Sequence, residues 1–185
     1  MGSRATHPTL IMRMRTTRLG STRRRLASGL KEIGEDEFGR AEKLWDAGKL
    51  KAALSLFKSM AEAGDTGAMT NVGYFLDEGL GVRRNWPEAR KWYLRAYSGG
   101  HFSGANNLGV HYRQVGNKKA ARKWFLRAAA LGDASGFLNA AQLLGRSSRS
   151  VEHARRLLQK TITSRYAIDF YKSEARDLLA RLRKK

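Results

Sequence analysis

The feature that most constrains the fold of this chain is an internal repeat. An alanine is followed three and four positions later by a bulky apolar pair in four places: Ala53-Leu56-Phe57, Ala89-Trp92-Tyr93, Ala121-Trp124-Phe125 and Ala154-Leu157-Leu158. The successive alanines are 36, 32 and 33 residues apart. A period in this range is typical of solenoids, in which each repeat buries its apolar face against its neighbours.

Small and polar residues recur in the same frame and mark helix ends and helix contacts. A glycine follows each of the first three alanines after eleven residues: Gly64, Gly100 and Gly132. Glycine in this position ends a helix in the left-handed conformation, and the next residues, Asp65 and Asp133, are suited to cap the following helix. Gly73 and Gly109 fall inside that helix. Glycine there costs about 1 kcal/mol relative to alanine, so we expect a partner helix to pack closely against bare backbone.

These registers predict two helices, A and B, in each repeat. Trp92 and Trp124 share one register of the B helices and are expected to be buried between layers, whereas Trp86 is expected to be half exposed. The A helices are expected over 35–47, 66–78, 102–115 and 134–145, and the B helices over 50–63, 86–98, 118–131 and 149–163. Asn85 with Glu88 predicts an N-cap and capping box, and Asn117 predicts a second N-cap. Apolar residues at helical spacing over 167–183 predict a closing helix. The predicted fold class is all-α, a right-handed α-solenoid of about four helix-turn-helix repeats with a C-terminal capping helix.

The charge of the chain is unevenly distributed. Residues 1–31 carry +8 without any acidic residue, residues 32–145 carry +4, and residues 146–185 carry +8 of the total of +20. We predict three parts: a basic, disordered extension over 1–31, a repeat domain over 32–165, and a capping helix with a basic tail over 166–185. For the extension, a transit peptide, a functional basic tail and a later translation start all remain open.

The motifs that suggest chemistry have simpler interpretations. The chain has no cysteine, which excludes disulfides and thiolate sites, and no apolar run approaches the roughly 18 residues of a membrane span. The glycines of Gly79-Leu80-Gly81-Val82 lie between predicted helices, so they form a turn rather than a phosphate loop. The four histidines match no zinc spacing. We therefore predict no enzyme, no cofactor and no metal, and a cytoplasmic location.

Residues 72–100, VGYFLDEGLGVRRNWPEARKWYLRAYSGG, resemble the Sel-one-like repeat, a relative of the tetratricopeptide repeat with the pattern LGxxYxxGxGVxxDxxKAxxWYxKAAxxG. The matching residues are Gly73, Gly79, Gly81, Val82, Ala89, Trp92, Tyr93, Ala96 and Gly100. Leu76, Asn85 and Tyr97 depart from the pattern. The resemblance extends over about 35–165, and it implies a scaffold or adaptor, since the members of this family are mostly of that kind and bind varied partners.

Analogy with tetratricopeptide repeats places the binding groove on the A helices. The expected contact residues are Thr70, Asn71, Tyr74, Asp77, Glu78, Asn106, Asn107, Val110, Arg113, Gln114, Asn139, Gln142 and Arg146. This set is polar and mixed in charge, which favours an extended polar peptide or a protein surface as the partner. Asn71, Asn107 and Asn139 recur in one register. They either bond the backbone of an adjacent helix or form a ladder of amides on the binding face.

The first predicted function is therefore that of a non-catalytic scaffold or adaptor that binds a protein or peptide partner on its concave face. The alternative is a nucleic-acid-associated protein that uses its basic termini, with weak, non-specific contacts to phosphates. The residues expected to make these contacts are Arg23, Arg24, Arg25, Arg155 and Arg156. An enzyme, or a dedicated inhibitor of one, is the third class.

Overall fold

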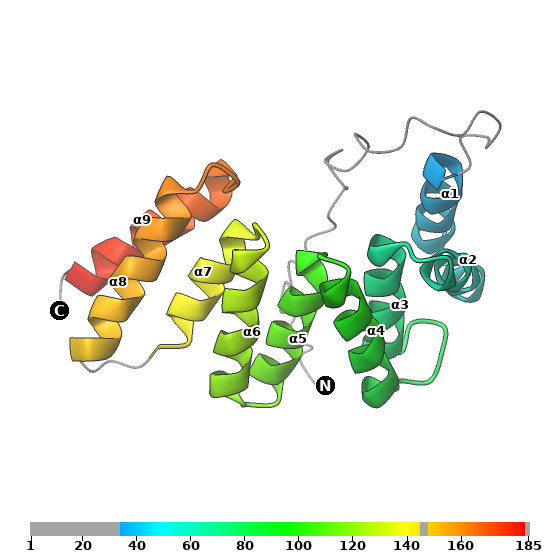
Figure 1. Cartoon of the computed structure of the whole chain (residues 1–185), viewed down its shortest axis with the longest axis horizontal. Helices are drawn as coiled ribbons and strands as arrows, with labels where there is room; N and C mark the ends of the chain where they lie inside the picture. Colours follow the sequence, from blue (N-terminus) through cyan, green and yellow to red (C-terminus); the bar gives the residue numbers. More distant parts are fainter. Residues whose placement is uncertain (1–33, 145–147, 184–185) are drawn as a thin grey trace, which may run out of the picture. The chain divides into compact units, whose positions relative to one another are not determined.

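The computed structural model describes residues 34–144 and 148–183, and the side chains of residues 37–144 and 149–182. Over these residues the chain forms α-helices and no strand. In chain order they are α1 (Gly34–Asp46), α2 (Leu50–Glu62), α3 (Thr66–Glu78), α4 (Trp86–Ser98), α5 (Phe102–Gln114), α6 (Lys118–Ala130), α7 (Ala134–Gln142), α8 (Ser148–Thr163) and α9 (Asp169–Arg183) (Figure 1). The predicted extension over 1–31 lies outside the described residues.

Each helix packs against the next along the chain, and α3 also contacts α5, as α7 contacts α9. The odd-numbered helices α1, α3, α5 and α7 are the predicted A helices, and α2, α4, α6 and α8 are the B helices. The arrangement is an all-α solenoid, which confirms the predicted fold class. The closing helix α9 packs against α8 and α7.

The ends of the helices agree with the expected ranges within a residue or two, except at α7. This helix ends at Gln142 rather than at residue 145. The backbone N–H groups of Leu143 and Leu144 bond the carbonyl groups of Ala140 and Ala141, so the last turn tightens to bonds between residues three apart. The predicted end was therefore too late.

All four predicted N-caps form with side-chain hydrogen bonds, including that of Asp133, whose Oδ1 accepts from the backbone N–H of Ser135 at 2.9 Å. Asp65 Oδ1 accepts from the backbone N–H of Ala68 at 2.7 Å, and Asn117 Oδ1 accepts from Ala120 at 3.0 Å. Asn85 Oδ1 accepts from the N–H of Glu88 at 3.2 Å.

The capping box predicted for α4 forms only in part. The Glu88 carboxylate accepts from Lys91 Nζ at 2.9 Å instead of reaching back to Asn85. The backbone N–H of Asn85 bonds the Leu76 carbonyl oxygen at 2.8 Å, so it does not need the Glu88 side chain. Only the Asn85 half of the box is present.

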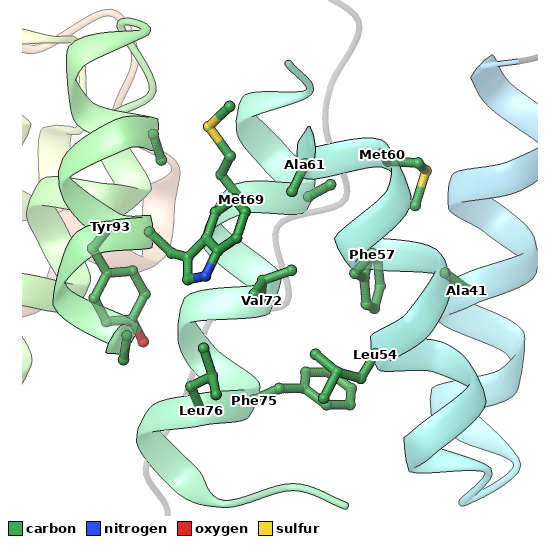
Figure 2. Close-up of a cluster of buried hydrophobic side chains, with 14 of the residues drawn as sticks. Ala41, Leu54, Phe57, Met60, Ala61, Met69, Val72, Phe75, Leu76 and Tyr93 are labelled. Carbon is green, nitrogen blue, oxygen red and sulfur yellow. The ribbon is translucent and has the colours of Figure 1, made fainter. Parts of the chain in front are cut away.

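The fourth position after each repeat alanine is the centre of the core. Phe57, Tyr93, Phe125 and Leu158 are each at most 1% exposed. Around Phe57, the side chains of α1, α2, α3 and α4 form one cluster of buried hydrophobic residues (Figure 2). The rings of Phe57 and Phe75 lie edge to face, with centroids 5.8 Å apart.

The third position of the register is less uniform than predicted. Trp92 is buried, as expected, but Trp124 is only partly buried. Its ring packs edge-on against Tyr97, with centroids 5.5 Å apart, and the Arg127 guanidinium carbon lies 4.3 Å from the Trp124 ring centroid. The expectation that both tryptophans are buried between layers was therefore wrong for Trp124.

The glycines within the A helices admit two kinds of close approach. A Cβ atom added at Gly73 would lie 2.6 Å from the Tyr93 ring, and one at Gly109 would lie 2.6 Å from the Phe125 ring. The predicted close packing of a partner helix against the bare backbone of these glycines is therefore confirmed, and an aromatic ring makes the contact. Backbone contact occurs instead at Gly104 and Gly136, where a Cβ atom would meet a carbonyl oxygen of the preceding B helix at 2.4 Å.

Replacing Gly104 by alanine tests the close approach of α5 to α4. We expect Gly104→Ala to lower the free energy of unfolding by about 1–3 kcal/mol, because the new methyl group meets backbone that only a helix shift can move. Gly39→Ala in α1 is the matched control, since nothing lies within 4 Å of its added Cβ. It should raise stability by about 0.5–1 kcal/mol. Denaturant titration measures both, and equal effects would contradict the assigned contact.

Candidate partner-binding face

The structure divides the predicted contact residues of the A helices into exposed and buried groups. The exposed or partly buried residues are Asn71, Tyr74 and Glu78 on α3, Asn106, Asn107, Val110, Arg113 and Gln114 on α5, and Asn139 and Gln142 on α7. Thr70 and Asp77 are buried, at 7% and 5% exposure. Their side chains face other parts of the fold, so we leave them out of the proposed contact surface. Arg146 lies outside the described residues.

Thr70 and Tyr74 show how α3 divides between these roles. The Thr70 hydroxyl donates to the backbone carbonyl of Thr66 at 3.0 Å, so its polar group is satisfied within the helix. Tyr74 is half-buried, and its ring centroid lies 5.7 Å from that of Trp45 on α1. Burial, with a smaller contribution from the nearby Glu78 and Asp77 carboxylates, raises the pKa of Tyr74 above 10.0, so the phenol remains a neutral donor.

The exposed side chains of α5 and α7 are held by neighbouring helices. The Arg113 guanidinium carbon lies 5.5 Å from the centroid of the Phe125 ring of α6. Gln142 Nε2 donates to Glu174 Oε1 of α9 at 3.2 Å. These contacts orient the two side chains while leaving both residues exposed.

The three asparagines of the recurring register are not equivalent. Asn107 interacts with the side chain of Tyr93 on the preceding B helix, which partly offsets the rise in the Tyr93 pKa that burial causes. The residues that correspond to Tyr93 for Asn71 and Asn139 are Phe57 and Phe125, which have no hydroxyl group. Asn107 therefore has a side-chain partner within the fold that neither of the two other asparagines can have. Whether Asn71 and Asn139 form part of a ladder on the binding face stays a prediction.

Asp77 belongs to a polar cluster that connects α3 to α5. Its Oδ1 atom lies 3.3 Å from Nδ1 of His111 and 3.5 Å from Nη2 of Arg84. The Trp86 ring, which is partly buried as predicted, stacks on the His111 ring with the two planes 4° apart. Sequence reasoning missed this pair, although Asp77 and His111 are 34 residues apart, about one repeat, and so lie on adjacent A helices.

The Asp77 and His111 side chains are 7% and 9% exposed, so the pair holds helices together rather than presenting a reactive group. Burial lowers the pKa of His111 below its usual 6.5, and the nearby Arg84 adds to this, whereas Asp77 opposes it. No group of three or more metal-ligating side chains occurs among the residues that the structure describes. In the same residues, no helix has the length and apolar character to cross a membrane.

Of the residues predicted to contact nucleic acid, Arg23, Arg24 and Arg25 lie outside the described part of the chain. Arg155 is partly buried, donates from Nη2 to the Leu182 carbonyl oxygen at 3.2 Å and lies 3.8 Å from a Glu152 carboxylate oxygen. Arg156 is exposed on α8. Arg155 therefore makes contacts within the fold, whereas Arg156 is exposed to solvent.

Protonation of His111 should destabilise the fold. Because the folded protein lowers the pKa of this histidine, the unfolded chain binds its proton first as the pH falls below about 6.5. We expect the melting temperature of the wild type to decrease between pH 7.5 and pH 5.5, and that of His111→Gln to decrease less. Thermal melts followed by circular dichroism would measure this. An unchanged pH dependence in the variant would contradict the role assigned to His111.

Comparison with known proteins agrees with this geometry. The family model described as Sel1 repeat matches residues 66–101 and 103–133. These ranges contain α3 with α4 and α5 with α6. No curated protein sequence matches the chain.

Two solved structures share the fold. A protective antigen present in uropathogenic Escherichia coli strains, displaying an SLR fold, is 27% identical with a TM-score of 0.52, over 59% of this chain and 25% of the antigen. A Sel1 repeat protein from Oxalobacter formigenes is 24% identical with a TM-score of 0.55, over 68% of this chain and 53% of that protein. This chain thus spans a quarter to about half of their lengths. Residues 66–101 and 103–133 thus match the Sel1 repeat, and the described helices share the solenoid fold of the two solved structures.

Proposed function

We propose that this protein is a non-catalytic scaffold or adaptor that binds a protein or peptide partner on its A helices α3, α5 and α7. Sel1 repeat proteins generally mediate protein–protein interactions. The observation that supports the proposal here is the set of exposed or partly buried polar side chains at equivalent positions of successive A helices. Packed helices hold these side chains at fixed spacing, which lowers the entropic cost of binding an extended partner.

The chemistry of this face favours a polar partner. Amide side chains both donate and accept hydrogen bonds, as the groups of a peptide backbone do. Glu78 on α3 and Arg113 on α5 are both exposed and opposite in charge, so a partner of mixed charge fits better than an apolar helix. Tyr74, half-buried against Trp45, adds a rigid aromatic surface of the kind that often dominates binding energy.

A triple variant at exposed positions tests this face. Arg113→Glu, Gln114→Ala and Gln142→Ala together should weaken binding of the partner by about 10-fold or more, since central contacts of an interface cost upwards of about 1 kcal/mol each. The melting temperature should change little, because all three residues are exposed. Affinity capture of the full chain, followed by mass spectrometry, identifies candidate partners, and calorimetry with the purified partner gives the dissociation constants.

The matched control is Lys58→Glu with Ser55→Ala and Ser59→Ala, which makes one charge reversal and two truncations on exposed positions of α2. The control protein should capture the same partner as the wild type and bind it with the same affinity. The proposal fails if no captured protein distinguishes the A-helix variant from the α2 control.

A further inference from the structure

Three B helices each carry two basic residues, four positions apart, in the same register of the repeat. The pairs are Lys91 with Arg95 on α4, Lys123 with Arg127 on α6, and Arg156 with Lys160 on α8. We call these six residues the basic row. They occupy the second and sixth positions after each repeat alanine, and at these positions α2 has Ser55 and Ser59. The basic row therefore begins at α4.

The helical register places the basic row on the side of each B helix that faces away from the core. At 100° per residue, the second and sixth positions point roughly opposite to the fully buried fourth position. Five of the six residues are exposed, and Arg127 is partly buried. The guanidinium carbons of Arg95 and Arg127 lie 4.3 Å from the ring centroids of Trp92 and Trp124, which fixes their direction.

The helices α4 and α6 bring their parts of the row together. The ring of Tyr97 on α4 packs edge-on against Trp124 on α6, with centroids 5.5 Å apart. The Arg127 guanidinium packs on the same Trp124 ring, so this member of the row lies next to a contact between α4 and α6. The repeated sequences RKWYLRA and RKWFLRA, at residues 90–96 and 122–128, build the same tryptophan–arginine pair twice.

The positive charge of this row is weakly compensated on its own helices. α6 has five basic residues and no acidic residue. On α4 the single acidic residue, Glu88, pairs with Lys91 at 2.9 Å. Like charges four positions apart destabilise a helix, so three such pairs are an unfavourable arrangement for folding alone. Packing on tryptophan explains the arginines at the sixth position, but it does not explain Lys123 or Arg156 at the second.

We infer that the basic row is a second interaction surface, which binds the phosphate backbone of nucleic acid without reading its sequence. Guanidinium groups pair with phosphate oxygens through two parallel hydrogen bonds, and ammonium groups do so as point charges. This surface is distinct from the A-helix face and does not depend on the function proposed for that face. It also differs from the basic termini, since four of its six residues lie on α4 and α6.

The surface favours nucleic acid over an acidic protein because its exposed side chains are charged and its aromatic rings are packed against neighbouring side chains. The large exposed hydrophobic residues of the described chain are Val115, Leu131, Tyr166, Ile168 and Phe170, and none of them lies on α4, α6 or α8. Protein interfaces depend on buried aromatic and aliphatic anchors at their centre. Protein–nucleic acid interfaces are polar, wet and strongly positive.

The salt dependence of binding tests the inference. The full chain is titrated into a fluorescein-labelled 20-base-pair DNA duplex at 50–200 mM KCl, and anisotropy gives the affinity. Lys91→Gln, Lys123→Gln and Arg156→Gln together should reduce the slope of log K against log salt by about 2.7, since each phosphate contact contributes about 0.9. Lys43→Gln, Lys51→Gln and Lys58→Gln remove equal charge from exposed positions of α1 and α2, and should leave the slope unchanged.

A variant that adds basic residues provides a second measurement, because it is expected to strengthen binding rather than weaken it. Ser55→Lys with Ser59→Arg extends the basic row to α2, and should increase the slope by about 1.8 on the same basis. Absence of binding at 50 mM KCl overturns the inference. Equal slopes in the two triple variants overturn it as well, because binding would then follow net charge alone. Displacement of the duplex by poly-glutamate at equal charge concentration would assign the surface to an acidic protein instead.

Discussion

The contact on which the stack depends is an aromatic ring of a B helix lying on a glycine of an A helix. Tyr93 lies on Gly73 and Phe125 on Gly109, so close that a methyl group at either glycine would overlap the ring. This contact sets the separation of the two helices within a repeat. In the last repeat the glycine and the aromatic ring are both replaced. Ala141 stands at the position of the glycine and Leu158 at that of the ring, and both lie in one core cluster.

Stacking between repeats uses a different contact. The backbone of α5 approaches that of α4 at Gly104, and α7 approaches α6 at Gly136, without any side chain between them. Tyr93 takes part in both levels of packing, since its ring lies on Gly73 of its own repeat and its side chain interacts with Asn107 of the next. The Asp77–His111 pair connects the same two A helices.

The sequence was sufficient for the features that neighbouring residues determine. Caps such as Asp65 and Asn117 depend on a residue three positions away, so the helix ends could be predicted closely. Features that depend on another helix were predicted less well. Thr70 and Asn71 are adjacent, yet only Thr70 is buried, and Trp124 is more exposed than Trp92 although both share one register. The Asp77–His111 pair could not be predicted from neighbouring residues, because its two members lie 34 residues apart on adjacent A helices.

The charge shows a different pattern when it is summed over the A and B helices instead of along the sequence. Summed along the chain, the excess of basic residues lies at the two ends. Sorted by helix, α4, α6 and α8 hold twelve basic residues and two acidic ones, whereas α3, α5 and α7 hold one basic residue and two acidic ones. Because A and B helices alternate along the solenoid, a charge that recurs with the repeat accumulates on one side of it. The row of B helices therefore presents mainly positive charge to a partner, whereas the row of A helices presents nearly none.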